Sequence, residues 1–203
     1  MSNKSLFKLI LLALLSAMIF VFFNVPMKIG VIEMAVAAII PVAVGAIVLG
    51  PLAGLFLGTV FGLASFLQCI GIFIPSAFGI LLFEINPFYA VLICFLPRMI
   101  MGLSAGLIFK ALSKIDRTKT VSFLVASLST AVVNTVLFMS VLMICYYPTD
   151  RFQDVIKGYG VTGFWATVIF IAGVNAIIEA VSCCVLGGAV SKAIYKIQET
   201  RKS

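Results

Sequence analysis

Six long apolar stretches, separated by short polar or glycine–proline breaks, dominate the pattern of the sequence. About 20 apolar residues are needed for a helix to cross the hydrocarbon core of a bilayer. By that measure the pattern predicts membrane-spanning helices at residues 6–23, 31–49, 51–69, 87–109, 121–146 and 163–194. We therefore expect an all-α integral membrane protein, in which residues 1–203 form one transmembrane domain of six helices.

Composition supports the membrane class. Hydrophobic residues make up 63% of the chain and charged residues only 10%, whereas a soluble domain is about half apolar and a quarter charged. The net charge of +7 would also suit a nucleic-acid-binding protein. The basic residues, however, lie at the ends of the apolar stretches, which is the pattern of membrane orientation. We therefore expect the basic residues to face a lipid bilayer, and we expect no nucleic-acid partner.

Lysine and arginine are unequally divided between the two sides of the predicted bundle. One side collects Lys4, Lys8, Lys110, Lys114, Arg117, Lys119, Lys192, Lys196, Arg201 and Lys202; the other has Lys28, Arg151 and Lys157. The positive-inside rule then places both termini in the cytoplasm. The N-terminal stretch resembles a signal peptide but lacks an A-x-A cleavage site, so it is interpreted as the first membrane helix.

The predicted outer connections are unusually apolar or aromatic. Residues 70–86 are nearly all apolar, and residues 147–162 mix polar with aromatic side chains, while residues 24–30 form a shorter link. Such segments can fold over the mouth of a bundle as a lid, or can rest in the lipid interface. The sequence leaves both interpretations open.

Small residues recur at four-residue spacing on three predicted helices. They are Gly50, Gly54, Gly58 and Gly62; Gly102 and Gly106; and Ala13 and Ala17. This spacing lines one helix face with small side chains, so that a neighbouring helix approaches closely. Packing inside the bundle is the default interpretation. The Ala13–Ala17 face is the best candidate for contact with another protein, because its helix is terminal and otherwise bulky.

The sequence offers little enzyme chemistry. Gly102 to Gly106 match G-x-S-x-G, the nucleophile motif of serine hydrolases, but the chain has no histidine to act as the base. It also lacks a phosphate-binding Walker A motif. The five cysteines lie in or beside apolar stretches with no metal-ligand spacing. We expect no enzyme activity, metal or cofactor.

Several polar residues interrupt the apolar helices. Arg98 lies in the middle of an apolar run, where a charge costs from about 3 to over 10 kcal/mol. At about 1.5 Å per residue, Arg98, Asn134 and Asn175 are each ~18 Å below the outer surface. Glu179 follows Asn175 by four residues, so it shares that helix face one turn deeper. Gln68 and Asn86 are nearer the outer surface. These six residues are the predicted substrate-binding set.

Two roles for Arg98 remain open. Its forked donors suit a carboxylate or phosphate, and the asparagines suit a hydroxyl or an amide of the same ligand. Alternatively, Arg98 forms a structural ion pair with Glu179.

A self-sufficient secondary transporter is an alternative function for a membrane protein of this kind. Such transporters usually have internal repeats and several deep acidic residues, whereas Glu179 is the one deep acid in this sequence.

The combination of features resembles a known family. The tight junction in GAIVLGPLAGLFLGTVFGLASF, the Ala13-x-x-x-Ala17 face and six helices are similar to the S component of energy-coupling factor (ECF) transporters, which import vitamins into bacteria. The segments IPSAFG and LPRMIMGLSAGLIFK look most like the pantothenate-specific branch. The resemblance implies a bacterial cell-membrane subunit that binds its vitamin from outside. Another vitamin, such as riboflavin, is the alternative.

The resemblance also implies partners. An S component docks through the small-residue face of its first helix, here Ala13 and Ala17, onto a transmembrane coupling subunit. Two cytosolic ATPase subunits drive the complex, and the S component topples in the membrane to release its ligand inside. No ATPase motif is then expected in this chain.

Overall fold

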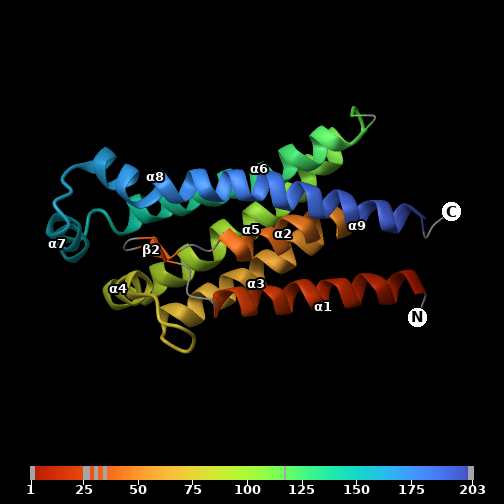
Figure 1. The fold of residues 1–203 in the computed structure, drawn as a ribbon. Helices are drawn as coiled ribbons and strands as arrows, with labels where there is room; N and C mark the ends of the chain where they lie inside the picture. Colours follow the sequence, from red (N-terminus) through yellow and green to blue (C-terminus); the bar gives the residue numbers. More distant parts are fainter. Residues whose placement is uncertain (1–2, 25–27, 30–31, 34–35, 117, 201–203) are drawn as a thin grey trace.

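The computed structural model describes residues 3–24, 28–29, 32–33, 36–116 and 118–200, and its long helices form one bundle (Figure 1). Both described ends of the chain lie at the same end of this bundle, and α4, α7 and β2 lie at the other. The elements are α1 (Asn3–Phe23), β1 (Lys28–Ile29), β2 (Ile32–Glu33), α2 (Val36–Leu49), α3 (Pro51–Cys69), α4 (Ala77–Ile85), α5 (Pro87–Leu112), α6 (Thr120–Cys145), α7 (Asp150–Gly158), α8 (Phe164–Ser182), η1 (Cys183–Gly187) and α9 (Gly188–Thr200).

Five stretches of helix in the described chain are long and apolar enough to cross a membrane. They are Ser5–Phe23, Pro51–Cys69, Pro87–Leu112, Thr120–Cys145 and Asn175–Ile197. The membrane class predicted from the sequence is thereby supported, and the helix predicted at 51–69 has the bounds of α3. The prediction of six crossings depends on α2, which is shorter, and it stays a prediction.

The helix predicted at 31–49 is wrong in its first part. Residues Ile32–Glu33 form β2, which pairs antiparallel with β1 through Lys28 with Glu33 and Ile29 with Ile32. β-Branched isoleucines favour this extended backbone. The 14 residues of α2 are then about 21 Å long. This helix lies inside the bundle, and Ile39, Val42 and Ala43 are fully buried.

The glycines of α3 bring it against α5. A Cβ at Gly54 would overlap the carbonyl oxygen of Gly102, and one at Gly58 would overlap that of Arg98. The predicted use of these glycines for close helix packing is thus confirmed. Gly50 is an exception, because a Cβ there meets no atom of the described residues within 4 Å. Its φ of 106° instead allows the tight turn before Pro51.

The predicted last helix, 163–194, is one continuous helical run that contains a π turn. Helices α8 and α9 are joined by η1, whose residues form wider i→i+5 turns. At Gly187 of η1, a Cβ would lie 3.2 Å from the hydroxyl of Ser127. The π turn is therefore placed where this helical run packs closely against α6.

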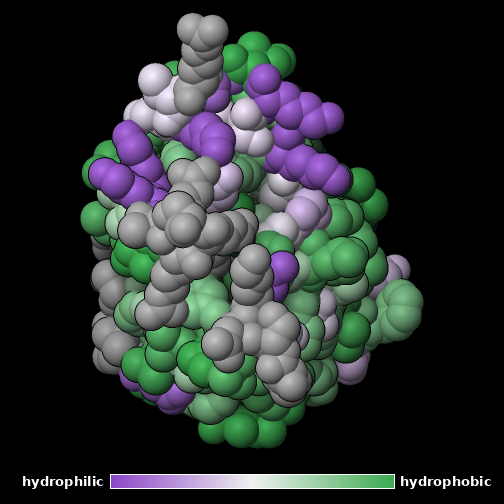
Figure 2. Space-filling model, turned by 90° about the vertical axis from the view of Figure 1, so that its right-hand side faces the viewer, coloured by the Kyte–Doolittle hydropathy of each residue, from purple (hydrophilic) through white to green (hydrophobic). Residues whose placement is uncertain are grey.

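The outside of the bundle suits a lipid environment. Large apolar side chains are exposed along its length, among them Leu52 (78%), Ile177 (66%) and Val136 (58%). Exposed apolar surface of this extent is typical of a membrane-facing protein. Figure 2 shows the end of the bundle at which the termini lie. Hydrophilic side chains gather in the upper part of this view, and hydrophobic residues cover the flanks.

The predicted outer connections contain short helices. Ser76 caps α4 by accepting a hydrogen bond from the Gly79 N–H (3.1 Å). Helix α7 buries Phe152 and Ile156 and exposes its charged residues. Arg151 and Glu84 form an exposed ion pair of 3.7 Å between α7 and α4, which contributes little because water screens it. Most of the predicted link at 24–30 lies outside the described residues.

Candidate functional site

A cavity of about 170 Å³ lies inside the bundle, at the depth of Arg98. Its wall is built by α1, α2, α3, α4, α5, α6 and α8. Five of the six residues predicted for a binding site line it: Gln68, Arg98, Asn134, Asn175 and Glu179. The estimate of a common depth from helix positions therefore identified side chains that share one cavity.

Arg98 is the cation of this cavity and is only 8% exposed. Its Nη1 donates to the carbonyl oxygen of Ile93, and its Nη2 lies 3.4 Å from the hydroxyl of Ser65. The guanidinium carbon lies 5.6 Å from the ring centre of Phe61 and 5.0 Å from that of Phe138. Its Nε is buried and has no hydrogen-bond partner among the described residues.

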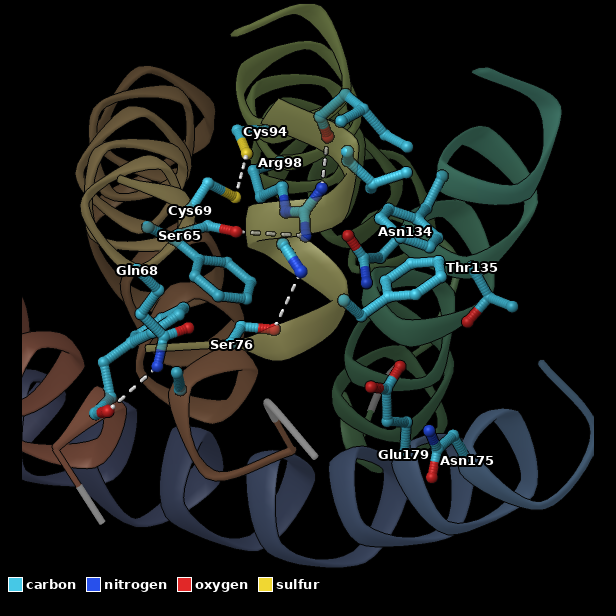
Figure 3. A pocket seen from close by; sticks show the side chains of 18 of the residues that line it. Ser65, Gln68, Cys69, Ser76, Cys94, Arg98, Asn134, Thr135, Asn175 and Glu179 are labelled. Carbon is cyan, nitrogen blue, oxygen red and sulfur yellow. Dashed lines mark hydrogen bonds between the residues drawn. The ribbon is translucent and has the colours of Figure 1, made fainter. Parts of the chain in front are cut away.

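Acceptor groups face the cavity from α6 and α8. Asn134, 7% exposed, has a buried Oδ1 without a hydrogen-bond partner in the described chain. Glu179, 9% exposed, lines the cavity from α8 with Asn175 one turn before it. Figure 3 shows Arg98 reaching in from α5, Asn134 on α6, and Glu179 beside Asn175 on the α8 side. The cavity thus has a cation on one side and acceptor oxygens on another.

The Arg98–Glu179 ion pair considered from the sequence is not formed. Among the described side chains, the ion pair within 4.0 Å is Arg151–Glu84 at the outer surface. Arg98 instead combines a backbone acceptor, a serine and aromatic faces, none of which carries a negative charge. Its charge is held in place without being neutralised.

Two predicted residues have structural partners. Gln68 lines the cavity and also donates from Nε2 to the carbonyl oxygen of Phe23 (3.1 Å), which joins α3 to the end of α1. Asn86 lies outside the cavity wall. Its Oδ1 accepts from the N–H groups of Phe88 and Tyr89, so it caps the start of α5. The Asn-Pro sequence at this helix start is the signal that could have identified the cap.

The apolar connection 70–86 contributes to the cavity wall through α4. Phe78, Gly79 and Leu82 of this short helix line the cavity. Of the two interpretations of this connection, the structure therefore favours a cover over the bundle interior. Sequence reasoning did not single out Ser65 and Thr135, which also line the cavity, because lone hydroxyl residues in a helix carry no strong signal.

Comparison with known families decides the class. The model of the ECF transporter, substrate-specific component, matches residues 7–187. The chain belongs to this family. It is therefore a substrate-binding membrane subunit of an ECF transporter, and the members of this family are transporter subunits rather than enzymes. No individual curated protein matches the chain.

The first helix of this S component exposes the face that was predicted for docking. Ala13 and Ala17 are exposed, and so are Leu9 (57%), Leu14 (56%) and Val21 (60%). The opposite face is buried against the bundle through Leu15 and Ile19. Ala13 and Ala17 are thus not used for packing within the chain.

Ser104, in the G-x-S-x-G match, donates to the carbonyl oxygen of Met101 within α5 (3.0 Å), as an ordinary helical serine does.

Proposed function

We propose that this S component binds a small anionic vitamin, with pantothenate as the best candidate, in the cavity at Arg98. One observation carries the proposal: Arg98 is buried, and no acidic side chain lies within ion-pair distance of it among the described residues. A buried charge without a counter-charge is costly. A ligand carboxylate would supply that charge through a charge-assisted hydrogen bond.

The rest of the cavity suits the other groups of pantothenate. Asn134, Asn175 and Glu179 present amide and carboxylate oxygens that accept hydrogen bonds from hydroxyl or amide N–H groups. Pantothenate carries two hydroxyls at the end opposite its carboxylate and one amide between the two ends. Its carboxylate would bind at Arg98 and its hydroxyl end on the α6 and α8 side. Aromatic residues, including Phe61 and Phe138, would contact its methyl groups.

The cavity size favours a compact vitamin over riboflavin, the alternative ligand. A cavity of about 170 Å³ is of the order of one that holds a benzene-sized molecule. A three-ring isoalloxazine would require the cavity wall, including α4, to move. A flexible open-chain acid adapts more easily to this space.

We also propose a transport cycle, which membership in the family supports. The subunit resides in a bacterial cell membrane with both termini in the cytoplasm and takes its vitamin from outside. The exposed face of α1 at Ala13 and Ala17 docks onto a transmembrane coupling subunit, and two cytosolic ATPase subunits drive release. The basic residues Lys110, Lys114, Lys192 and Lys196 are exposed near the end that would face the cytoplasm, which supports this orientation.

Calorimetric titration of the purified full chain tests the proposal. We expect pantothenate to bind, and pantothenol, in which an alcohol replaces the carboxylate, to bind at least about tenfold more weakly. Arg98→Gln should weaken pantothenate and leave pantothenol nearly unchanged, because the lost contact is to the carboxylate. Arg151→Gln, at an exposed site outside the cavity, is the matched control. Equal affinity of the wild type for the two ligands would contradict the role of Arg98.

A further inference from the structure

Two thiols of the cavity wall lie within reach of one another. The Sγ atoms of Cys69 and Cys94 are 3.6 Å apart, and the residues are 6% and 2% exposed. Both are thiols in the structure, and both line the cavity (Figure 3). A pair this close can form a disulfide, which neither cysteine can do alone.

The helix packing holds the pair together. Cys69 is the last residue of α3, and Cys94 lies about two turns into α5. A Cβ at Gly62 would lie 2.9 Å from the carbonyl oxygen of Cys94, so the backbones of these helices are close at this level. The sulfurs of a disulfide are about 2.05 Å apart. From the observed 3.6 Å, formation of the bond requires the two sulfurs to approach by a further ~1.5 Å.

The pair lies at the base of the helix that covers the cavity. Helix α4 is connected to α3 directly after Cys69, and it leads into α5 before Cys94. A Cβ at Gly79 of α4 would lie 2.9 Å from the Cys69 sulfur, so α4 packs directly on this thiol. A bond between Cys69 and Cys94 would close the chain from 69 to 94 into a loop that contains all of α4.

We propose that Cys69 and Cys94 form an oxidisable dithiol site whose disulfide restrains α4 and thereby slows ligand exchange. A small two-electron oxidant, a peroxide or a low-molecular-weight disulfide, reaches the pair. The two S–H bonds break, one S–S bond forms, and two protons and two electrons pass to the oxidant. With hydrogen peroxide, the O–O bond breaks and two waters leave. The effect on exchange rests on the proposed function of the cavity; the formation of the bond does not.

The surroundings favour oxidation over metal binding. Arg98 follows Cys94 by four residues, so its guanidinium lies on the same face of α5 one turn away. A buried positive charge opposes the binding of a metal cation nearby. The described residues also contain no group of three potential metal ligands. A neutral oxidant meets no such repulsion.

The covalent step can be tested by mass spectrometry. Trypsin cleaves after Lys28 and Arg98, and the peptide between these sites contains Cys69 and Cys94 but no other cysteine. The full-length protein in detergent is treated with hydrogen peroxide, and its remaining thiols are alkylated before digestion. We expect this peptide to carry two alkyl groups before oxidation and none after it, with a mass two hydrogens below the dithiol. Prior reduction with a phosphine should restore both labels.

Matched variants separate this pair from the other cysteines. Cys145→Ala, outside the cavity wall, should leave the oxidation unchanged, whereas Cys69→Ala should leave Cys94 alkylated after mild peroxide treatment. If both thiols are still alkylated in the oxidised wild type, no disulfide has formed and the proposal is overturned. The pair would then be only an S–H···S contact between buried side chains. A disulfide that forms equally well between Cys94 and another residue would also overturn it.

Ligand exchange tests the consequence. Dissociation of radiolabelled pantothenate should be several-fold slower from the oxidised wild type than from the reduced wild type. For Cys69→Ala, the dissociation rate should be the same after oxidation and after reduction. Equal dissociation from both wild-type forms would overturn the restraint of α4. If pantothenate does not bind at all, the proposed function fails, while the peptide masses still decide whether the disulfide forms.

Discussion

Arg98 is positioned inside the bundle by groups that direct its charge without cancelling it. The Ile93 carbonyl oxygen and the Ser65 hydroxyl orient the guanidinium, and it lies near the faces of Phe61 and Phe138. Each cation–π contact contributes about 0.5–2 kcal/mol, more when water is excluded. These contacts offset part of the cost of burial, and the unpartnered Nε leaves one donor for a ligand.

Asn134 allows a ligand role to be separated from a structural one. Its buried Oδ1 has no partner among the described groups, so Asn134→Leu, which keeps the number and branching of the side-chain heavy atoms, removes an unsatisfied acceptor. We expect the thermal midpoint of the ligand-free protein to stay the same or rise. Pantothenate affinity should fall by about fivefold, because a ligand hydrogen bond worth about 1 kcal/mol is lost.

The control for Asn134 is Thr130→Val, also buried on α6 but bonded to its own helix through Ala126 and absent from the cavity wall. It should leave affinity unchanged. A loss of folding in Asn134→Leu, with affinity retained by the folded fraction, would contradict the ligand role.

Asp116, between α5 and α6, predicts a pH dependence. Its carboxylate accepts hydrogen bonds from the N–H and hydroxyl groups of Ser122 and Thr118. These bonds, chiefly the one from the Ser122 N–H, hold the pKa of Asp116 below its ordinary value. The contribution of the ionised Asp116 carboxylate to the stability of the fold is therefore complete above about pH 4, its unfolded pKa. This contribution is lost as the pH falls through the lower folded pKa.

Thermal melts across pH check this linkage. Asp116→Asn should melt below wild type at pH 7, and the difference should shrink as the pH falls below about 4, the unfolded pKa, and on through the lower folded pKa. Asp154→Asn, at an exposed position of α7, controls for the change in net charge. A constant difference between Asp116→Asn and wild type from pH 7 to pH 3 would exclude the proposed hydrogen-bonded carboxylate.

At the scale of single residues, helical spacing predicted much of the lining of the cavity. Residue depth and the i, i+4 relation brought Arg98, Asn134, Asn175 and Glu179 to one cavity, because regular helices convert sequence position into height. Spacing does not determine side-chain direction between helices. The contact of Cys69 with Cys94 and the absence of an Arg98–Glu179 ion pair therefore required the three-dimensional packing.

At the scale of elements, the contact of α3 with α5 determines where the site lies. Their glycines allow the backbones to touch, which sets Ser65, Cys69, Cys94 and Arg98 on adjoining helix faces. A larger side chain anywhere along this line would separate the helices and move one wall of the cavity relative to the other. The glycine stripe is thus a structural requirement of the site as well as of the bundle.

Gly58→Ala tests this contact. The added methyl group would overlap the Arg98 carbonyl oxygen. We expect destabilisation of about 1–3 kcal/mol from overpacking, which outweighs the gain of up to about 1 kcal/mol from alanine in a helix. At Gly173 of α8, the one described side chain that a Cβ would meet is Ile169, at an ordinary 3.7 Å. Gly173→Ala should therefore melt at or above wild type, and a higher melting temperature for Gly58→Ala than for Gly173→Ala would refute the close contact.

The long apolar helices were predictable and the short elements were not. Helices α3, α5 and α6 agree with the sequence to within three residues at each end, because proline starts and long apolar runs define them. Helices α4 and α7 have nine residues each, which is too short for periodicity to distinguish a helix from a loop. Their structure depends on packing against the rest of the bundle.

At the scale of the whole molecule, the bundle separates the two surfaces that we propose for substrate binding and for docking. The cavity lies beneath α4, toward the end opposite the termini, while Ala13 and Ala17 lie on the outer face of α1. No side chain is shared between them, since neither Ala13 nor Ala17 lines the cavity. Substrate capture and docking to a partner can therefore be disrupted independently.

Ala13→Trp and Ala17→Trp test that independence. A tryptophan on this exposed face adds bulk without entering the core, so we expect folding and pantothenate affinity close to wild type. Uptake by cells that also contain the coupling subunit and the ATPases should fall to background, because close approach of a partner helix requires small residues. Ala189→Trp, at an exposed alanine of α9, controls for the added bulk and should transport normally. Normal uptake by the α1 variants would show that the partner docks elsewhere, and lost pantothenate binding would show that this face supports the fold.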